Sequence, residues 1–444
     1  MKIVIVGAGE VGSHLAKLLS SEDIDITLVD SNADRLGVLD ANYNLMTVAG
    51  DPTTFVSLRE ANVRGCDLFI AVTPYETDNA VACSMAKQLG ARCTVARIER
   101  YDYMMPDNRP LVARMGIDRL IYPEYLAAEE IITALSHSWA RNWFELHNGQ
   151  IILVGIRLAA GAEVEGMQLR QLATRSHNFH VSAIRRHHET IIPGGNDRMQ
   201  CDDILYVTTT RDYLPELLAL TGKVQHRIRR VLVMGGGKIA VRLSNMVDER
   251  FKITIIESDL ARCHQLPQLC PGADIIHGDA RDIDTLIDAG IDEVDAFVAL
   301  TDSSEANILA CLTAKELGVK KTVAEVENIQ FISQAEGLNI GTIINKKLLA
   351  SSSIFQLLLD SDSSNSRCLA LADAEVAELE VKPGSKLTKA PVKDLKLPHD
   401  ITLGALIRDN QGMLISGMTL IQPGDHVLVF CLHGAIRKVE KLFS

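Results

Sequence analysis

Three glycines near the start of the chain have the spacing of a phosphate-binding turn. Gly7, Gly9 and Gly12 follow an apolar run and open an amphipathic segment, in the pattern G-x-G-x-x-G. The first glycine of this pattern permits a tight turn, the second lets the backbone approach a pyrophosphate, and the third lets helix and strand pack closely. The helix that follows offers unpaired N–H groups and a partial positive charge to phosphate oxygens. The residues predicted to bind a nucleotide here are Gly7, Ala8, Gly9, Glu10, Val11 and Gly12.

A carboxylate stands where recognition of a ribose requires one. Asp30 ends the second apolar run, 18 residues beyond Gly12. A carboxylate at that position accepts hydrogen bonds from ribose hydroxyls and repels a 2′-phosphate, which favours NAD(H) or an adenine nucleotide over NADP. The alternative is that Asp30 caps the helix that follows it.

Later strand ends add polar residues to the same edge. Asp51, Thr73 and Pro74 follow predicted strands, and open α/β sheets bind ligands at the carboxyl ends of their strands. Arg97 ends the fifth predicted strand, where a guanidinium could pair with a phosphate. For Arg97 a surface ion pair with Glu99 is the alternative.

The whole pattern occurs again 228 positions later, with two informative changes. Ala240 replaces Gly12 and adds a methyl group between helix and strand, whereas Glu325 replaces Arg97 and would repel a phosphate. We therefore expect the second site to bind a nucleotide more weakly, with altered preference, or not at all. The predicted residues of this second site are Gly235, Gly236, Gly237, Lys238, Ile239, Glu257, Asp279 and Thr301.

Short apolar strands alternate with helices after both glycine turns. In the first copy the predicted helices are 11–19, 33–42, 55–61 and 77–89, and the predicted strands after the first are 24–29, 45–49, 66–73, 94–98 and 119–122. This alternation predicts a doubly wound, Rossmann-like parallel sheet with helices on both faces. Repeated correspondence at one displacement indicates an internal duplication.

Two smaller segments separate and follow the repeats. Strands are predicted within 151–156, 181–184 and 203–207, and the C-terminal part repeats their pattern, since Gly424 to Val429 corresponds to Asp202 to Val207. Asp360 to Ser366 is predicted to be a linker because it is rich in serine and acid. We predict two α/β domains, each followed by a small α+β domain, with boundaries 1–140, 141–225, 226–360 and 361–444.

Composition excludes several classes of function. A net charge of −12 over 444 residues argues against a nucleic-acid partner, because non-specific binding requires a basic surface. Two short basic clusters, 185–188 and 227–230, are interpreted as solvated surface. No apolar run has the length of a membrane-spanning helix. Because a core strand starts at Lys2, we expect no signal peptide.

Cysteines and histidines give no metal-binding pattern. The nine cysteines include no C-x-x-C pair. Cys66, Cys83, Cys93 and Cys311 lie in or beside apolar runs and are typical of reduced core residues in a cytoplasm. Cys263, His264 and Cys270 lack the spacing of a zinc site. The loose cluster His177, His180, His187 and His188 is interpreted as exposed loop and hairpin residues. We therefore predict no metal site.

The chain resembles the TrkA family of potassium-uptake regulatory proteins, which carry tandem RCK (KTN) domains. The resemblance covers the whole chain and is most specific at 7–12, Val29-Asp30, 71–73, 95–98 and in the order of the four domains. It implies that each α/β domain is an RCK N-terminal domain and each small domain an RCK C-terminal domain. It also places Asp51, Thr73 and Pro74 near the adenine and phosphates.

The resemblance further implies ligands and partners. The expected ligands are NAD(H) or ATP/ADP. The expected partner is a TrkH- or TrkG-type membrane potassium channel subunit, reached from the cytoplasm as a peripheral protein on the inner face of the plasma membrane. Homo-oligomers are expected, with rings of RCK domains built from a dimer or a tetramer.

Two functions from different classes fit a repeated nucleotide fold. A regulatory module would use ligand binding to shift a conformational equilibrium, which requires different affinities for two states. An NAD-dependent oxidoreductase would require a proton donor and orienting groups beside the nicotinamide. The small domains offer no concentrated set of such residues, so the sequence favours the regulator, and we predict that the chain is not an enzyme.

Overall fold

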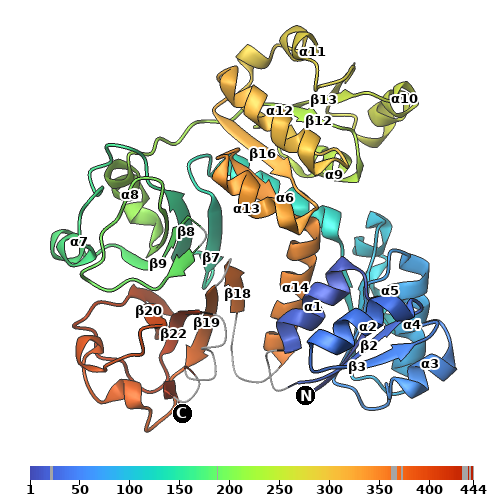
Figure 1. Cartoon of the computed structure of the whole chain (residues 1–444), viewed down its shortest axis with the longest axis horizontal. Helices are drawn as coiled ribbons and strands as arrows, with labels where there is room; N and C mark the ends of the chain where they lie inside the picture. Colours follow the sequence, from blue (N-terminus) through green and yellow to red (C-terminus); the bar gives the residue numbers. More distant parts are fainter. Residues whose placement is uncertain are drawn as a thin grey trace. The chain divides into compact units, whose positions relative to one another are not determined.

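The computed structural model describes residues 1–20, 24–187, 189–361, 368–371, 374–432, 439 and 442–443. Figure 1 shows the chain, which divides into two compact units. Unit 1 comprises Met1–Ala127 and Asn345–Leu358, and unit 2 comprises Ala128–Ile344 and Leu359–Ser444. Unit 1 holds the first nucleotide lobe (β1–β6), whereas unit 2 holds the first small lobe (β7–β11), the second nucleotide lobe (β12–β17) and the second small lobe (β18–β22).

The first nucleotide lobe is a six-stranded parallel sheet in the order β3-β2-β1-β4-β5-β6. Because the order reverses between β1 and β4, the carboxyl ends of these strands flank a crevice. The strands are β1 Lys2–Val6, β2 Asp25–Asp30, β3 Met46–Ala49, β4 Leu68–Ala71, β5 Cys93–Arg97 and β6 Arg119–Ile121. The helices are α1 Glu10–Ser20, α2 Ala33–Asn42, α3 Phe55–Glu60, α4 Glu76–Gln88, the 3-10 helix η1 Tyr101–Met104, and α5 Arg109–Arg114.

The second nucleotide lobe has the same topology, β14-β13-β12-β15-β16-β17. Its strands are β12 Arg230–Met234, β13 Lys252–Glu257, β14 Asp274–His277, β15 Ala296–Ala299, β16 Lys321–Glu325 and β17 Thr342–Ile344. Its helices are α9 Lys238–Met246, α10 Leu260–Leu269, α11 Ile283–Asp288, η3 Ile291–Glu293, α12 Ser304–Glu316 and α13 Ile329–Gly337. The predicted duplication of a doubly wound parallel sheet is therefore confirmed.

Each small lobe is a five-stranded antiparallel sheet, in the orders β10-β9-β11-β8-β7 and β18-β19-β22-β20-β21. The first contains β7 Asn142–Leu146, β8 Ile151–Arg157, α7 Leu169–Arg175, β9 His180–Arg186, β10 Glu189–Ile191, β11 Ile204–Thr209, η2 Arg211–Tyr213 and α8 Leu214–Thr221. The second contains β18 Cys368–Leu371, β19 Ala374–Glu380, η4 Lys386–Thr388, η5 Val392–Asp394, β20 Ile401–Arg408, β21 Gln411–Leu414 and β22 His426–Leu432. Within unit 2 one apolar core joins the two sheets, with Leu153 and Tyr206 from the first and Ala405 and Phe430 from the second.

Helix α14 (Lys346–Ser361) follows the second nucleotide lobe in sequence but packs on the first. Ala350 and Ile354 are fully buried in the same core cluster as Leu15 of α1, and α14 lies beside α1 in Figure 1. The Ser351 hydroxyl donates to the backbone oxygen of Val11 at 3.4 Å. Unit 1 therefore encloses a core whose parts come from two segments that are far apart in the sequence.

Several sequence predictions need correction at this level. Strands β7 and β10 and helix α6 (Pro123–Ser136) were not predicted. Of the predicted linker Asp360 to Ser366, the first two residues end α14, and 362–366 lie outside the described residues. Arg185 and Arg186 are not solvated surface, because both form ion pairs with largely buried carboxylates, of Glu336 and Asp203.

Lys321 gives unit 2 a pH-dependent stability. Its side chain is buried at the start of β16, where Nζ donates to the backbone oxygen of Ala140 at 3.1 Å and to the Thr342 hydroxyl at 2.9 Å. Burial, together with repulsion from Arg141, lowers the pKa of Lys321 to about 7, while Glu130 opposes the shift. The unfolded chain keeps an ordinary lysine, so between pH 7 and about 10.5 it binds more protons than the folded chain.

Stability is therefore expected to rise with pH across this window and to lose that contribution as pH falls through 7. The urea midpoint of unit 2, followed by the fluorescence of Trp139 and Trp143, checks this. Both tryptophans are buried in the first small lobe, so they report this unit. The Lys321→Met variant should lose the rise; equal slopes for the two proteins would contradict the assignment.

Candidate nucleotide-binding sites

The three glycines of the first turn have different physical roles. Gly7 has φ +101°, which side chains rarely adopt, and a Cβ there would lie 3.0 Å from the backbone nitrogen of Thr73. A Cβ on Gly12 would lie 1.9 Å from the backbone oxygen of Gly7, which no packing tolerates. A Cβ on Gly9 would have no atom within 4 Å. Two glycines are thus required by the fold, and the third leaves open space above the turn.

The Asp30 carboxylate fixes the glycine turn. One oxygen accepts from the backbone nitrogen of Ala8 at 2.6 Å and the other from that of Asn32 at 2.8 Å. The alternative that Asp30 caps α2 is wrong, because Asn32 is the capping residue and accepts from the backbone nitrogen of Arg35 at 3.1 Å. Asp30 therefore stands at the crevice, bound to the segment that would contact a pyrophosphate.

The other predicted residues of the first lobe divide between crevice and core. Thr73 and Pro74 form the loop after β4, and Asp51 the loop after β3, where hydrogen bonds from Thr53 lower the pKa of the Asp51 carboxyl. Glu10 begins α1 and is largely exposed. Ala8 and Val11, by contrast, point their side chains into the core, so only their backbone can reach a ligand.

Arg97 ends β5, as predicted, and forms the ion pair with Glu99 that was the alternative. The guanidinium lies 3.7 Å from the Glu99 carboxylate, a long separation for an ion pair, and the Arg97 side chain is 18% exposed. Its Nε is buried and has no hydrogen-bond partner among the described residues. A buried donor without an acceptor costs free energy, which an anionic ligand would recover.

Two residues important for the crevice were missed from the sequence. Asn79 of α4 accepts from the backbone nitrogen and hydroxyl of Thr73, at 2.9 and 2.8 Å, and donates to the backbone oxygens of Thr73 and Arg97, both at 3.0 Å. Lys347 of α14 pairs with Glu10 at 2.5 Å. The repeat itself carried a signal for Asn79, because Asn307 is its counterpart and makes the same four bonds.

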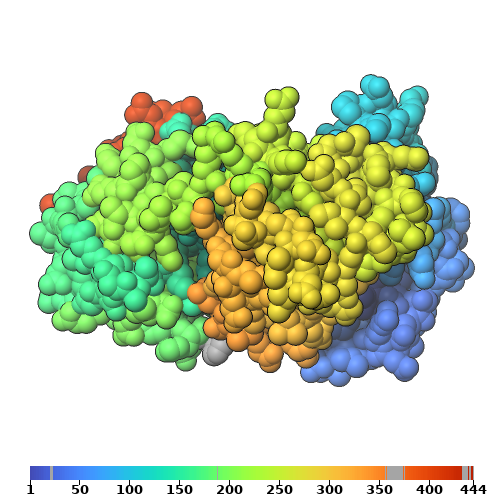
Figure 2. Space-filling model, turned by 90° about the horizontal axis from the view of Figure 1, so that it is seen from above, coloured from blue at the N-terminus to red at the C-terminus, as the bar shows by residue number. Residues whose placement is uncertain are grey.

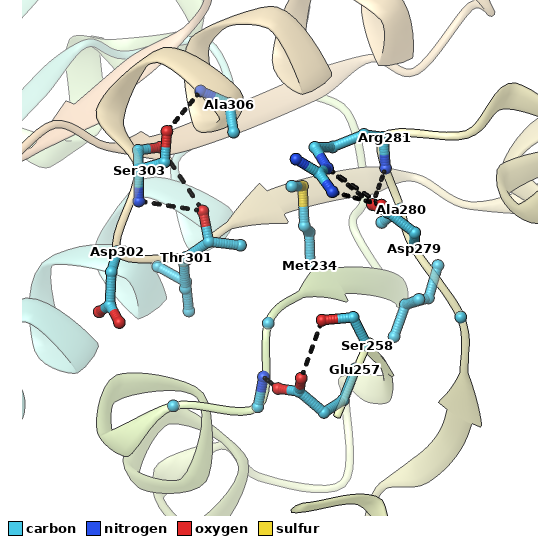
Figure 3. A pocket seen from close by; sticks show the side chains of 16 residues that line it. Met234, Glu257, Ser258, Asp279, Ala280, Arg281, Thr301, Asp302, Ser303 and Ala306 are labelled. Atoms are coloured by element: carbon cyan, nitrogen blue, oxygen red, sulfur yellow. Dashed lines mark hydrogen bonds and ion pairs between the residues drawn. The ribbon is translucent and has the colours of Figure 1, made fainter. Parts of the chain in front are cut away.

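The second nucleotide lobe contains a cleft of about 420 Å³ at the matching position. Figure 3 shows Glu257 below the cleft, Asp279 and Arg281 on one side, and Thr301 to Ser303 on the other. Glu257 accepts from the backbone nitrogen of Gly236 at 2.7 Å, as Asp30 does in the first lobe. Six predicted residues line this cleft: Gly235, Gly236, Gly237, Glu257, Asp279 and Thr301.

Of four further residues near the second glycine turn, Arg281 alone lines the cleft. Lys238 and Ile239 begin α9 and do not belong to the cleft lining. Arg281 forms an ion pair with Asp279 at 2.6 Å and lowers the pKa of that carboxyl. Arg262 donates to the backbone oxygen of Gly236 at 2.9 Å. Arg281 therefore gives the cleft a cationic side chain whose guanidinium is already paired, whereas Arg262 lies outside the cleft lining.

The substitution of Gly12 by alanine in the second copy is accompanied by a reciprocal change. Ala240 is fully buried in α9. At the position of Ala8 the second lobe has Gly236, where a Cβ would lie 2.5 Å from the side chain of Leu266. The second turn thus gains a methyl group at one position and loses one at another, with Leu266 occupying the space.

Comparison with known proteins identifies the family. Models of the TrkA-N domain match residues 3–123 and 231–346, and models of the TrkA-C domain match residues 153–222 and 376–444. The chain belongs to the TrkA family. It is 31% identical to the Trk system potassium uptake protein TrkA of Halomonas elongata, over 100% of this chain and 99% of that protein. TrkA of Haemophilus influenzae is 30% identical, with the same coverage.

Solved structures show the same fold at lower identity. The crystal structure of the GsuK RCK domain superposes with a TM-score of 0.61 at 16% identity, over 100% of this chain and 94% of that one. The GsuK channel bound to NAD gives 0.60 at 16% identity, with 100% and 78% covered. GsuK bound to ADP gives 0.52 at 15% identity, with 81% and 70% covered. These relatives are potassium-uptake and channel proteins, so the oxidoreductase alternative is not supported.

Two further observations concern membranes and metals. Among the described residues, no helix combines the length and apolar character needed to span a membrane. The same residues hold no group of three or more His, Cys, Asp or Glu that could bind a metal ion. His177 and His187 are exposed as predicted, but His180 lies within β9 with its Nε2 3.1 Å from the Thr402 hydroxyl. His188 lies outside the described residues.

Proposed function

We propose that this chain is the nucleotide-binding regulatory subunit of a Trk-type potassium-uptake system. It acts in the cytoplasm, on the inner face of the plasma membrane, and controls a TrkH- or TrkG-type membrane subunit through a ligand-dependent conformational change. The observation that carries the proposal is the pair of glycine turns, each held by a strand-end carboxylate at 2.6 or 2.7 Å. A Cβ built on Gly9 would have no atom within 4 Å, which supports the approach of a pyrophosphate to the backbone there.

The proposed ligand is NAD(H) or ATP/ADP. The NAD and ADP named with the GsuK structures support this choice, as does a carboxylate that would repel the 2′-phosphate of NADP. In the first lobe the ligand would contact the backbone at 7–12 and the side chains of Asp30, Asp51, Thr73 and Arg97, with Pro74 beside them. In the second lobe the proposed residues are Gly235, Gly236, Gly237, Lys238, Ile239, Glu257, Asp279 and Thr301.

The ion pair between Glu10 and Lys347 suggests how occupancy is transmitted. Phosphates bound at the start of α1 would place negative charge beside Glu10 and compete for the ammonium group of Lys347, which lies 2.5 Å from that carboxylate. Lys347 belongs to α14, whose end leads in sequence to the second small lobe. A ligand that binds more tightly when the pair is rearranged shifts the position of α14.

The proposal includes the assembly. The subunit is a homo-oligomer, a dimer or tetramer whose RCK domains form a ring, and it has no nucleic-acid partner. Its domains are 1–140, 141–225, 226–360 and 361–444. The antiparallel sheets that share one core within unit 2 support the assignment of 141–225 and 361–444 as paired C-terminal domains.

Calorimetric titration with NADH, NAD, ATP and ADP tests the proposal. The wild-type chain should bind at least one of them saturably, and Asp30→Ala should weaken that binding at least tenfold, with circular dichroism unchanged. Glu257→Ala is the matched variant of the second cleft and should alter a weaker binding event. Equal affinity in all three proteins would refute the assignment.

A transport assay tests the regulatory role. In proteoliposomes, the nucleotide should change potassium flux through a TrkH-type subunit only when this chain is present. Steady oxidation of NADH would instead indicate an enzyme.

A further inference from the structure

A group of cationic side chains lies where the first small lobe meets the second nucleotide lobe, and none of these side chains belongs to a glycine turn. Within unit 2 these lobes lie side by side, as the ion pair between Arg185 and Glu336 requires and as Figure 2 shows for the green and orange segments. The group, here named the junction cluster, comprises Arg141, Arg157, Arg185, Lys223 and Lys315.

Hydrogen bonds connect the junction cluster to the end of α13. Arg185 contacts both carboxylate oxygens of Glu336, at 3.2 and 2.8 Å, and Arg157 donates to its backbone oxygen at 2.9 Å. Arg141 donates to the side-chain oxygen of Asn339 at 2.9 Å, and Lys315 to the backbone oxygen of the same residue at 2.5 Å. Residues of both lobes therefore converge on one short segment of chain.

The junction cluster carries more positive charge than its acidic neighbours balance. Within the described part of the chain, two carboxylates pair with its five cations: that of Glu336 and that of Asp202, whose side chain is 71% exposed and lies 3.3 Å from Arg157. Burial, followed by repulsion from Arg157 and Arg185, lowers the pKa of Arg141 to about 10, although Glu336 and Tyr206 oppose the shift. Burial and repulsion by Arg141 and Arg157 likewise lower the pKa values of Lys223 and Lys315.

Two arginine donors in the cluster are left without acceptors. The Nε atoms of Arg157 and Arg185 are buried and have no hydrogen-bond partner among the described residues, and their side chains are only 16% and 12% exposed. A buried, charged donor without an acceptor is more costly than a neutral one. An incoming acceptor would remove that cost, and the acceptor that suits planar guanidiniums is a phosphate or carboxylate.

We propose that the junction cluster binds an oligophosphate anion, which is either free or the phosphate chain of a nucleotide. The anion would accept from Arg141 and Arg157 of the small-lobe side and from Lys315 of the nucleotide-lobe side, and it would cancel their mutual repulsion. Because its ligands come from both lobes, its binding fastens one lobe to the other. The junction cluster would thus be a ligand-binding site of unit 2 that is separate from the glycine turns, and it does not depend on the function proposed above.

Calorimetric titration of the full chain with sodium pyrophosphate, at low ionic strength and with NADH saturating, tests the site. Saturable binding is expected for wild type. Binding should weaken at least tenfold in the double variant Arg141→Gln, Lys315→Gln. Arg211→Gln is the matched control, because it removes an exposed cation of the same small lobe that pairs with Glu145, and its affinity should stay within twofold of wild type. Equal affinities in the three proteins, or a wild type that binds neither pyrophosphate nor ATP saturably, would overturn the proposal.

A second readout separates anion binding from damage to the fold. Pyrophosphate should raise the urea midpoint of the wild type, monitored by Trp139 and Trp143, and should leave that of the double variant unchanged. NADH affinity of the double variant should equal that of wild type, so loss at the junction is distinguishable from loss at the glycine turns. Titration with ATP distinguishes a free oligophosphate from the phosphate chain of a nucleotide. Binding of ATP without binding of pyrophosphate assigns a nucleotide, whereas equal affinities for ATP and pyrophosphate assign the phosphates themselves.

Discussion

Replacing Gly12 by alanine is expected to destabilise the first nucleotide lobe by about 3 kcal/mol or more. The added Cβ would lie 1.9 Å from the backbone oxygen of Gly7, so α1 must move away from the turn. That movement would pull on Leu15 and on Ile354 of α14, which share the core with α1. Hydrogen exchange of the peptides that cover β1 and β4 measures the effect, because both tryptophans lie outside unit 1.

The reciprocal variant is the control. Ala240→Gly in α9 removes one buried methyl group and adds backbone freedom, so a loss of about 1 to 2 kcal/mol is expected. The two changes exchange the same pair of residue types at equivalent positions, and only the first creates a clash. The exchange of β1 and β4 in Gly12→Ala is compared with that of the equivalent strands β12 and β15 in Ala240→Gly. A similar increase in exchange in both variants would show that the first turn accommodates the methyl group, contrary to the geometry.

Replacing Gly9 by valine is expected to abolish nucleotide binding in the first lobe while the fold stays intact. No atom lies within 4 Å of a Cβ built on Gly9, so the Cβ of the new side chain meets no protein atom there. It would instead occupy the space in which a pyrophosphate approaches the backbone. An affinity loss of at least about 100-fold follows if the phosphates are excluded, since each tenfold corresponds to about 1.4 kcal/mol.

Gly37→Val provides the comparison for this second variant. Gly37 lies on the exposed side of α2, and a Cβ built on it also has no atom within 4 Å. Calorimetry with the best-binding nucleotide should give wild-type affinity for Gly37→Val, whereas Gly9→Val should lose the binding event that Asp30→Ala weakens, with matching circular dichroism. Survival of that event in Gly9→Val would move the ligand away from the first turn.

The order of strands and helices could be predicted because its signals are local. A glycine turn after an apolar strand and an acid at the end of the next strand are read from a few neighbouring residues, and the displacement of 228 repeats them. The carboxylates of Asp30 and Glu257 both contact their turns for the same reason. Local patterns of this kind are enough to specify topology.

Other features could not be predicted because they depend on distant pairing. The sequence of α14 does not indicate which nucleotide lobe its apolar side covers. The ion pair between Lys347 and Glu10 could therefore not be predicted. The junction cluster combines residues from β8, β9 and α12, which are far apart in sequence. The different roles of Gly9 and Gly12 likewise follow from distances to backbone atoms, which a pattern of letters does not contain.

The position of α14 also determines when the first lobe can mature during synthesis. Its core includes Ala350 and Ile354, so a nascent chain that has passed Ala127 still lacks part of its apolar interior. At about 5 to 20 residues per second, ribosomes need roughly 10 to 50 s to reach Ile354. During that interval the first sheet and α1 present an uncovered apolar face. The core of the first nucleotide lobe is therefore complete only after α14, in the C-terminal half of the chain, has been translated.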